Sequence, residues 1–317
     1  MTPDDPRDLH APTAADAPGP GVTTSAAMDV HLVDGTYELF RHHFAVPSHL
    51  DDAGIEVAAT RGVLGSLMMM LEDGATHVAV ATDHVIESFR NDLYDGYKTG
   101  DGMEPVLLTQ FPFLEDALRA LGVTVWAMED QEADDGLAAG AAVAAADERV
   151  ERVLICTPDK DLGQCVGGKV FQFDRRKGEV RDAAGVREKF GVGPESIPDY
   201  LALVGDTADG FPGLAGWGAK STATVLAYYE HLEAIPALAK DWAVEVRGAV
   251  KLATTLHENR ADADLFKVLA TLRADHPVGT VDEWRWTGPT PELAEWAQRL
   301  GAPGLVGRAD RLASRRG

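Results

Sequence analysis

The hydrophobic and polar positions of the chain alternate between two patterns up to about residue 175. Short apolar runs are typical of buried strands, and longer stretches with apolar residues three and four positions apart are typical of helices. The runs predict strands at residues 30–33, 78–81, 123–126, 153–156 and 170–173. The longer stretches predict helices at residues 61–71, 106–121 and 134–146, and Gly122 follows the second of these as a helix cap would.

Strands that alternate with helices indicate an α/β fold with a mostly parallel central sheet. After about residue 190 the pattern changes to helices and glycine turns, and no convincing strand follows. Residues 1–27 are acidic and rich in Pro and Ala without any periodicity, so we expect a disordered tail there. The predicted organisation is a tail at 1–27, a catalytic core at 28–190 and a helical region at 191–317, the last two joined in one compact unit.

Composition and charge limit the possible functions. Hydrophobic residues make up 45% and charged residues 25%, as in ordinary globular proteins, and no apolar run reaches the roughly 18 residues of a membrane span. The N-terminus lacks the basic flank and apolar stretch of a signal peptide, so we expect a cytoplasmic protein that binds no membrane. The formal net charge of −22 argues against unspecific binding to phosphate backbones, unless cations neutralise many carboxylates at one site.

Acidic residues follow three of the predicted strands: Asp34, Asp83 and Asp159. Ligands of open α/β sheets bind beyond the carboxyl ends of the strands, so these three side chains indicate one site. Glu132 and Asp135 lie on one side of a helix that starts there. With the neighbouring acids, the candidate site contains nine carboxylates, namely Asp34, Asp83, Glu132, Asp134, Asp135, Asp159, Asp161, Asp206 and Asp209.

Each acidic cluster also has an ordinary explanation when it is taken alone. An Asp-Gly pair is usually a turn, acids in a first helical turn are usually caps, and an Asp-Lys-Asp segment is usually a solvated loop. If the carboxylates converge, they raise one another's pKa, and divalent cations such as Mg²⁺ relieve the repulsion. Two such ions can activate a water and stabilise the leaving oxygen of a phosphodiester. The ten histidines and two cysteines show no zinc-binding spacing, and no P-loop motif occurs.

A glycine-rich turn at residues 213–223 runs into a predicted helix. Its glycines leave backbone amides free, and the helix N-terminus that follows can bind an anion. Lys220 and Ser221 can then contact a phosphate without reading the base sequence. A Gly-x-Gly alone is more often an ordinary turn, but this longer segment begins four residues after Asp209. The expected DNA contacts in this segment are Gly213, Gly216, Gly218, Lys220 and Ser221.

Taken together, these segments resemble the bacterial 5′→3′ exonuclease and flap endonuclease family, which includes the N-terminal nuclease domain of DNA polymerase I. The resemblance covers roughly residues 28–290, and its order and spacing are highly specific. It implies a core related to PIN nuclease domains with a helical arch at about 84–112, followed by a region with a helix–three-turn–helix (helix-hairpin-helix) motif. The matching segments are 31–36, 89–90, 97–98, 131–135, 157–162, 203–209 and 211–220.

The resemblance also implies a site with two or more Mg²⁺ or Mn²⁺ ions. One ion would be surrounded by the first four carboxylates, namely Asp34, Asp83, Glu132 and Asp134. The other would be held by Asp159, Asp161, Asp206 and Asp209. In such enzymes the backbone carbonyls of the glycine turn hold a K⁺ ion, which helps to grip duplex DNA.

In the predicted arch, Arg90, Tyr97 and Lys98 match positions of the family pattern. Lys98 would steady the scissile phosphate by its charge, which matters more in a dry site than in water, and its ordinary alternative is a surface lysine. Arg90 would offset phosphate charge, and Tyr97 would contact the DNA. The expected catalytic residues are therefore Lys98, Arg90, Asp34, Asp134 and Asp159.

We therefore expect an enzyme that hydrolyses DNA phosphodiester bonds at 5′ flaps, nicks or 5′-ended duplexes, in replication or repair, close to the nucleoid. No polymerase region follows in the sequence, so we expect a stand-alone nuclease, and its oligomeric state stays open with a monomer favoured. Two alternatives stay open as well. A DNA-structure-binding protein with weak or no catalysis is suggested by the acidic surface, and a PIN-type ribonuclease would share the fold.

The first prediction concerns Asp101, which stands where the family usually has an arginine three residues after Lys98. The family's Asp-Asn before its Pro-Gly is likewise Asp209-Gly210 here. An anion in the arch repels the 5′ strand, so we expect Asp101→Arg to strengthen binding of a 5′ flap and to raise its cleavage rate. Flap binding and single-turnover cleavage measure this, and unaltered values for the variant contradict the idea.

Overall fold

The computed structural model of the protein describes residues 28–316, and the tail expected at 1–27 lies outside the described residues. Its centre is a six-stranded sheet with the order β3-β2-β1-β4-β5-β6, in which only β6 is antiparallel to its neighbour. This sheet confirms the predicted α/β class. The strands are β1 (Met28–Asp34), β2 (His77–Asp83), β3 (Thr124–Met128), β4 (Val150–Cys156), β5 (Val170–Asp174) and β6 (Glu179–Arg181).

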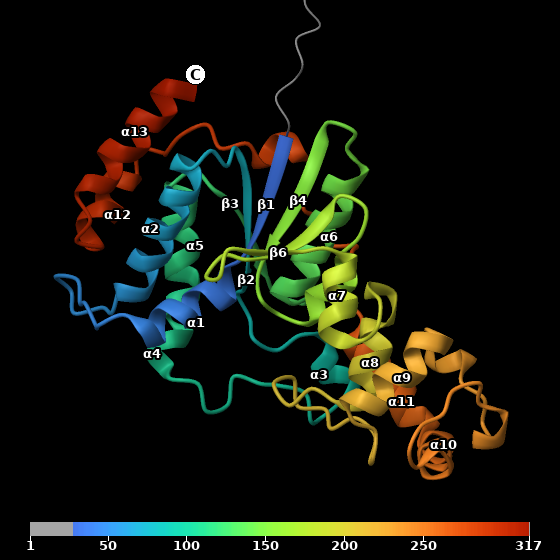
Figure 1. Ribbon diagram of the computed structural model, residues 1–317. Coiled ribbons are helices and arrows are strands. Elements are labelled where there is room, and N and C mark those ends of the chain that lie inside the picture. Colours follow the sequence, from blue (N-terminus) through green and yellow to red (C-terminus); the bar gives the residue numbers. More distant parts are fainter. Residues whose placement is uncertain (1–27, 317) are drawn as a thin grey trace, which may run out of the picture.

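Helices cover both faces of the sheet, and a group of helices lies beyond the carboxyl ends of its strands (Figure 1). The helices of the core are α1 (Gly35–Ala45), α2 (Ala58–Glu72), α3 (Phe89–Leu93), α4 (Pro105–Leu108), α5 (Gln110–Ala120), α6 (Ala133–Ala146) and α7 (Ala183–Phe190). Those that follow are α8 (Ile197–Val204), α9 (Ala219–Tyr229), α10 (Ala249–Glu258), α11 (Arg260–Ala270), α12 (Leu293–Arg299) and α13 (Gly304–Arg316). No helix among them is long and apolar enough to cross a membrane.

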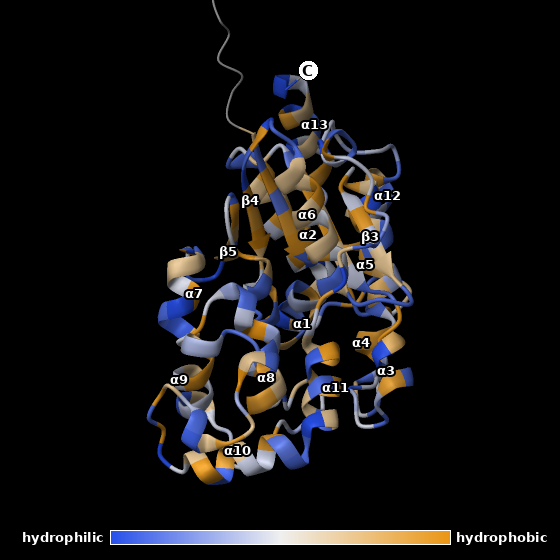
Figure 2. Cartoon of the chain, turned by 90° about the vertical axis from the view of Figure 1, so that its right-hand side faces the viewer, coloured by the Kyte–Doolittle hydropathy of each residue, from blue (hydrophilic) through white to orange (hydrophobic). Residues whose placement is uncertain are grey.

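The sheet is buried on both faces, as its nearly continuous apolar strands require. In β1, Val33 packs with α2 and α5, whereas Val30 and Leu32 pack with α6 on the opposite face. Successive side chains of a strand point to opposite faces, so this alternation follows from the strand geometry. Figure 2 shows the hydrophobic residues concentrated in the strands and in the inward sides of the helices.

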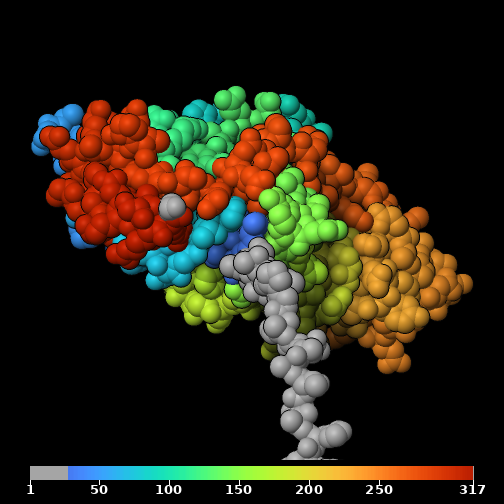
Figure 3. All heavy atoms as spheres, turned by 90° about the horizontal axis from the view of Figure 1, so that it is seen from above, coloured from blue at the N-terminus to red at the C-terminus, as the bar shows by residue number. Residues whose placement is uncertain are grey.

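Helices α12 and α13 return from the helical region to the opposite end of the molecule, where they cover α2 and α5 (Figure 3). The segment that leads to them is fixed by Trp286, whose backbone N–H donates to Thr76 O and whose indole N–H donates to Leu121 O, both at 2.8 Å. Leucines in and directly after these helices complete the core, namely Leu293, Leu300, Leu305 and Leu312. The end of the chain therefore stabilises the α2 side of the sheet.

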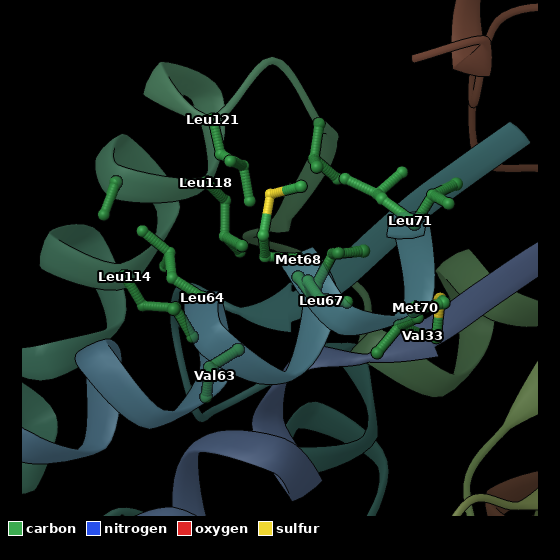
Figure 4. Close-up of a cluster of buried hydrophobic side chains, with 14 of the residues drawn as sticks. Val33, Val63, Leu64, Leu67, Met68, Met70, Leu71, Leu114, Leu118 and Leu121 are labelled. Atoms are coloured by element: carbon green, nitrogen blue, oxygen red, sulfur yellow. The ribbon is translucent and has the colours of Figure 1, made fainter. Parts of the chain in front are cut away.

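The packing of α2 on α5 illustrates why these segments form helices. Leu64, Met68 and Leu71 recur four and three residues apart along α2, so they share one face of the helix. Figure 4 shows this face against Leu114 and Leu118 of α5. Each leucine that is fully buried in this way contributes roughly 1.5–3 kcal/mol relative to an exposed one.

The structure differs from the sequence-based expectation between residues 84 and 121. The helix expected at 106–121 is divided at Thr109 into α4 and α5, because Pro112 has no N–H to bond the carbonyl of Leu108 in a continuous helix. The segment expected as a helical arch, 84–112, contains only the short helices α3 and α4 and the first turn of α5. Three glycines lie in the connection between α3 and α4, and glycine disfavours helix: Gly96, Gly100 and Gly102.

The second prediction tests how the segment before α12 is joined to α5. Gly122 has φ +84°, and a Cβ there would lie 1.9 Å from the carbonyl oxygen of Gly288. Gly54 has a similar φ of +79° but open space around it. The left-handed backbone costs an alanine about 1–2 kcal/mol, and forced overpacking adds about 1–3 kcal/mol. We therefore expect Gly122→Ala to lower the free energy of unfolding more than the control Gly54→Ala does. If denaturant unfolding shows equal losses of unfolding free energy for the two variants, the backbone around Gly288 can move aside at no cost.

Candidate metal centre

The carboxyl ends of neighbouring parallel strands bring the first acidic residues together. Asp34 ends β1, Asp83 ends β2 on one side of it, and Asp159 follows β4 on the other side. Asp34 is only 5% exposed. Its Oδ1 accepts a hydrogen bond from the N–H of Tyr37 (2.8 Å), which caps α1, and its Oδ2 accepts one from the hydroxyl of Thr157 (2.9 Å). The start of α1 therefore fixes this carboxylate at the edge of the sheet.

Two groups of three carboxylates lie close enough to share a cation, and they have Asp161 in common. In each group, one oxygen from every residue lies within 4.8 Å of the others. The groups are Asp134 with Asp159 and Asp161, and Asp161 with Asp206 and Asp209. The expected division of the ligands differs from this geometry, because Asp134 falls with Asp159 and Asp161 rather than with the acids of β1 and β2. One oxygen, Asp161 Oδ1, is buried without a hydrogen-bond partner.

The convergence of these acids disturbs their protonation. Burial raises the pKa of Asp34 to about 7, and the nearby charges of Asp159 and Asp83 add to this shift. Burial and the charge of Asp159 likewise raise the pKa of Asp134 and of Asp161 well above the ordinary range. Both causes disfavour the charged form of a carboxylate. The positive charge near these three acids is therefore too small to offset their burial and mutual repulsion.

Two lysines neutralise part of the cluster. Lys98 Nζ lies 2.8 Å from Glu132 and 3.0 Å from Asp209, and Lys160 Nζ lies 2.5 Å from Asp206. Burial alone would lower the pKa of Lys98, but the two carboxylates raise it well above its ordinary value. Lys98 is therefore cationic at neutral pH, and it lies at the candidate site as expected. Lys160 was not among the expected site residues, although it stands between two of the predicted acids in the Asp-Lys-Asp segment.

The remaining acids of α6 face the base of the predicted arch. Glu132 accepts hydrogen bonds from Ser88 Oγ (2.7 Å) and from the hydroxyl of Tyr97 (3.3 Å), besides its contact with Lys98. Tyr97 is only 4% exposed, so its expected contact with DNA is not available in this conformation. Ser88 was not predicted, because nothing in its local sequence indicates a partner 44 residues away.

Arg90 and Asp135 also have surroundings that differ from the expectation. Arg90 is 1% exposed and Asp135 is fully buried. The guanidinium group donates two hydrogen bonds, of 2.7 and 2.8 Å, to the two oxygens of Asp135. A buried guanidinium requires such a carboxylate partner. Arg90 therefore does not face the position of a phosphate, and Asp135 lies outside both groups of carboxylates.

The glycine turn starts directly beside the cluster. Asp206 and Phe211 form a two-way backbone bridge, with hydrogen bonds of 2.8 and 3.1 Å. Gly213 and Gly216 have φ of +66° and +88°, and α9 begins after Gly218, whose N–H donates to Ser221 Oγ (3.1 Å). Lys220 is exposed in the first turn of α9. The turn thus leads from the carboxylates to a helix N-terminus and an exposed lysine.

Gly210, which replaces the family's asparagine, lies where the turn meets the arch. It has φ +88°, and a Cβ there would lie 2.1 Å from the carbonyl oxygen of Gly96. The N–H of Lys98 donates to Asp209 O at 3.0 Å in the same place. This close approach requires a residue without a side chain, so the departure from the family pattern has a local steric cause.

A mostly parallel α/β sheet with convergent carboxylates at its carboxyl edge, continued by a glycine turn, places the chain in the class of PIN-like α/β folds. Residues 29–191 match the family model described as "5'-3' exonuclease, N-terminal resolvase-like domain", and residues 192–292 match "5'-3' exonuclease, C-terminal SAM fold". The chain belongs to the 5′-3′ exonuclease family.

Its relatives include enzymes of two lengths. DNA polymerase I of Pseudomonas aeruginosa is 36% identical over 254 residues, which are 77% of this chain and 27% of that protein. The 5′-3′ exonuclease of Aquifex aeolicus is 32% identical over 215 residues, which are 67% of this chain and 73% of that protein. The chain thus spans about a quarter of the length of the DNA polymerase I relatives that it matches.

Two solved structures have the same fold. The T5 D15 protein co-crystallized with metal ions has a TM-score of 0.59 at 17% identity, over 90% of this chain and 98% of that one. The catalytic core of Rad2 in complex with DNA substrate has a TM-score of 0.59 at 16% identity, over 90% and 91%. This likeness extends over both the sheet and the helical region.

The third prediction follows from the raised pKa of Asp34. The pKa of Asp34 is about 7 in the folded protein against an ordinary value of 3.8, so the folded state binds more protons between these values. Stability then falls as the pH rises through this interval. We expect the free energy of unfolding, measured with chelator by denaturant titration between pH 4.5 and 8, to fall less steeply with pH in Asp34→Asn than in the wild type. Parallel profiles would show that Asp34 titrates normally.

Proposed function

We propose that the protein is a divalent-metal-dependent 5′-3′ exonuclease and flap endonuclease that hydrolyses DNA near 5′ ends. The observation that carries this proposal is the pair of carboxylate groups that share Asp161 at the carboxyl edge of the sheet. The match to the family over residues 29–292 supports the same reaction. Because the proposed substrate is DNA, we place the enzyme in the cytoplasm with the nucleoid. We further propose that it acts as a monomer.

The carboxylates fit hard divalent cations. All ligand atoms in the two groups are carboxylate oxygens, which Mg²⁺ and Mn²⁺ prefer over softer ligands. Asp161 Oδ1 is buried and accepts no hydrogen bond, so it is free to serve as a ligand atom. Burial and the charge of Asp159 raise the pKa of Asp134, and a bound cation would oppose this shift. The residues that would hold the ions are Asp134, Asp159, Asp161, Asp206 and Asp209, with Asp34 and Asp83 beside them. When bound, such ions supply Lewis-acid stabilisation of phosphate charge and activate water.

The residues of the chain have separate tasks in this reaction. Attack of water on phosphorus breaks the bond to the 3′ oxygen and leaves a 5′-phosphate and a 3′-hydroxyl. Lys98 is cationic and partly exposed at the edge of the cluster, so it can stabilise the charge that develops on the phosphate. Thr157 and the N–H of Tyr37 hold Asp34 in one orientation. These contacts keep the acidic side chains ordered before the substrate arrives.

The glycine turn is the element that we assign to the duplex. The first turn of α9 presents backbone N–H groups, and Lys220 adds an exposed positive charge. Such an arrangement binds phosphates without sequence preference. We extend the proposal to a K⁺ ion at the backbone carbonyls of this turn. The segment between α3 and α4 would then contact the 5′ strand.

One observation favours a second candidate function. Asp101 is exposed in the segment between α3 and α4, where a positive charge would assist a 5′ strand, and the whole chain has a net charge of −22. A protein that binds DNA junctions but cleaves them weakly would have these features. The pair of carboxylate groups argues for cleavage, since buried like charges are costly unless cations are bound.

The fourth prediction tests the proposed activity. With a 5′-labelled flap duplex and Mg²⁺ or Mn²⁺, we expect short 5′ products that chelator abolishes. Asp134→Ala combined with Asp159→Ala should slow cleavage by at least about 100-fold, because electrostatic stabilisation in a water-poor site is lost. The exposed Asp130→Ala is the matched control and should cleave like the wild type. Flap binding without cleavage under every metal would favour the junction-binding protein, and faster cleavage of the matching RNA would favour a ribonuclease.

A further inference from the structure

The ion pair of Arg90 and Asp135 joins two elements that approach the candidate metal centre from different sides. Arg90 belongs to α3 at the base of the arch, and Asp135 belongs to the first turn of α6. The pair is bidentate and closed off from solvent. Bidentate arginine–carboxylate pairs fix orientation as well as distance, so the first turn of α6 is held at a set angle to α3.

The same pair reaches a third element, the end of α11 in the helical region. Arg90 Nε donates to the carbonyl oxygen of Leu269 at 2.8 Å, and Nη2 donates to that of Thr271 at 3.2 Å. From the other side, the N–H of Arg273 donates to Asp135 Oδ1 at 2.8 Å. The pair therefore fastens the helical region to the arch and to the catalytic core at one point.

The neighbours of Asp135 in the chain depend on this arrangement. Asp135 Oδ2 also accepts a hydrogen bond from the N–H of Glu132 (3.0 Å) and thereby closes the N-terminus of α6. Asp134 precedes it and lies in one of the carboxylate groups, with Asp159 and Asp161. Adjacent residues of a helix project about 100° apart, so a fixed Asp135 determines where the carboxylate of Asp134 points.

We propose that Arg90 and Asp135 are positioning residues of the metal centre, which neither bind a metal ion nor touch the DNA. The inference rests on the proposed function only in that the carboxylates bind divalent cations. Its consequence is that the arch base and the end of α11 must both be in place for Asp134 to be correctly oriented. DNA that orders these two regions would then also order the metal ligands.

A direct role for Asp135 as a metal ligand makes the opposite prediction for Arg90. If Asp135 could bind the ion, removal of the arginine would free a carboxylate and remove a nearby positive charge. Both changes strengthen the binding of a cation. If the pair only positions α6, removal of the arginine leaves Asp135 buried and unpaired, disturbs the first turn and weakens the binding. The sign of the change therefore distinguishes the two roles.

The fifth prediction measures Mn²⁺ binding to the full chain by titration calorimetry, without DNA. We expect Arg90→Met to weaken Mn²⁺ binding by about 10-fold or more, the usual size of effect for residues that orient metal ligands. Arg90→Lys keeps the charge but not the bidentate geometry, so it should bind Mn²⁺ more tightly than Arg90→Met and more weakly than the wild type. Mn²⁺ binding by Arg90→Met that equals or exceeds that of the wild type overturns the proposal.

A matched control separates positioning from general loss of stability. The Asp51 side chain is only 4% exposed and pairs with Arg299 at 3.4 Å, which joins the segment between α1 and α2 to α12, away from α6 and α11. Asp51→Asn should lower the unfolding midpoint as Asp135→Asn does, but it should leave Mn²⁺ affinity unchanged. If both asparagine variants weaken Mn²⁺ binding equally, the proposal is wrong. If Arg90→Met does not fold, Arg90→Lys replaces it in the test. An Mn²⁺ affinity of Arg90→Lys equal to that of the wild type would also contradict a positioning role.

The test is independent of the proposed reaction. A wild-type protein that binds Mn²⁺ but cleaves no flap substrate would overturn the proposed nuclease function and leave this inference standing. If the wild type cleaves the flap substrate, kcat and KM provide a second test of the positioning role. At saturating metal, we expect Arg90→Lys to lower kcat with little change in KM for the flap, because neither residue of the pair contacts DNA. A change in KM alone would instead indicate a direct contact with the substrate.

Discussion

The mutual repulsion of carboxylates at the carboxyl edge of the sheet is the constraint on which the rest of this structure depends. Parallel strands end at the same edge, so the acids that follow β1, β2 and β4 cannot avoid one another. Burial and like charge raise the pKa of Asp34, Asp134 and Asp161 together. A fold of this kind tolerates such a cluster only if cations, from the chain or from solution, lie among the acids.

The cations that the chain supplies also determine its architecture. Lys98 comes from the arch base and contacts acids of both α6 and the 206–209 loop, while Lys160 comes from the loop after β4. Each contact therefore joins segments that are remote in the sequence. Arg90 does the same between α3, α6 and the end of α11. The arrangement of the arch base and the helical region around the sheet thus depends on the electrostatics of the acidic edge.

The elements that the sequence predicts well are those with local causes. Apolar runs predicted all five parallel strands, three of which are followed by an aspartate of the cluster, and a single glycine after α5 predicted its end. The three-residue, largely exposed β6 has no such pattern and was missed. The burial of Arg90 and Tyr97 was missed for another reason. Their partners lie up to 181 residues away, and no local pattern distinguishes an arginine that binds phosphate from one that binds a buried carboxylate.

Asp134 and Asp135 show why the identity of a residue does not establish its role. The two are adjacent in sequence and chemically identical, but the helix turns them to different sides, one toward Asp159 and Asp161 and the other toward Arg90. A carboxylate that is paired with a basic side chain, as Asp135 is with Arg90, stabilises the fold. Carboxylate oxygens that accept no hydrogen bond, of which the buried Oδ1 of Asp161 is the clearest case, are available to an external cation. The nine acids of the sequence pattern are therefore divided by their partners, and a guanidinium on α3 determines that division within α6.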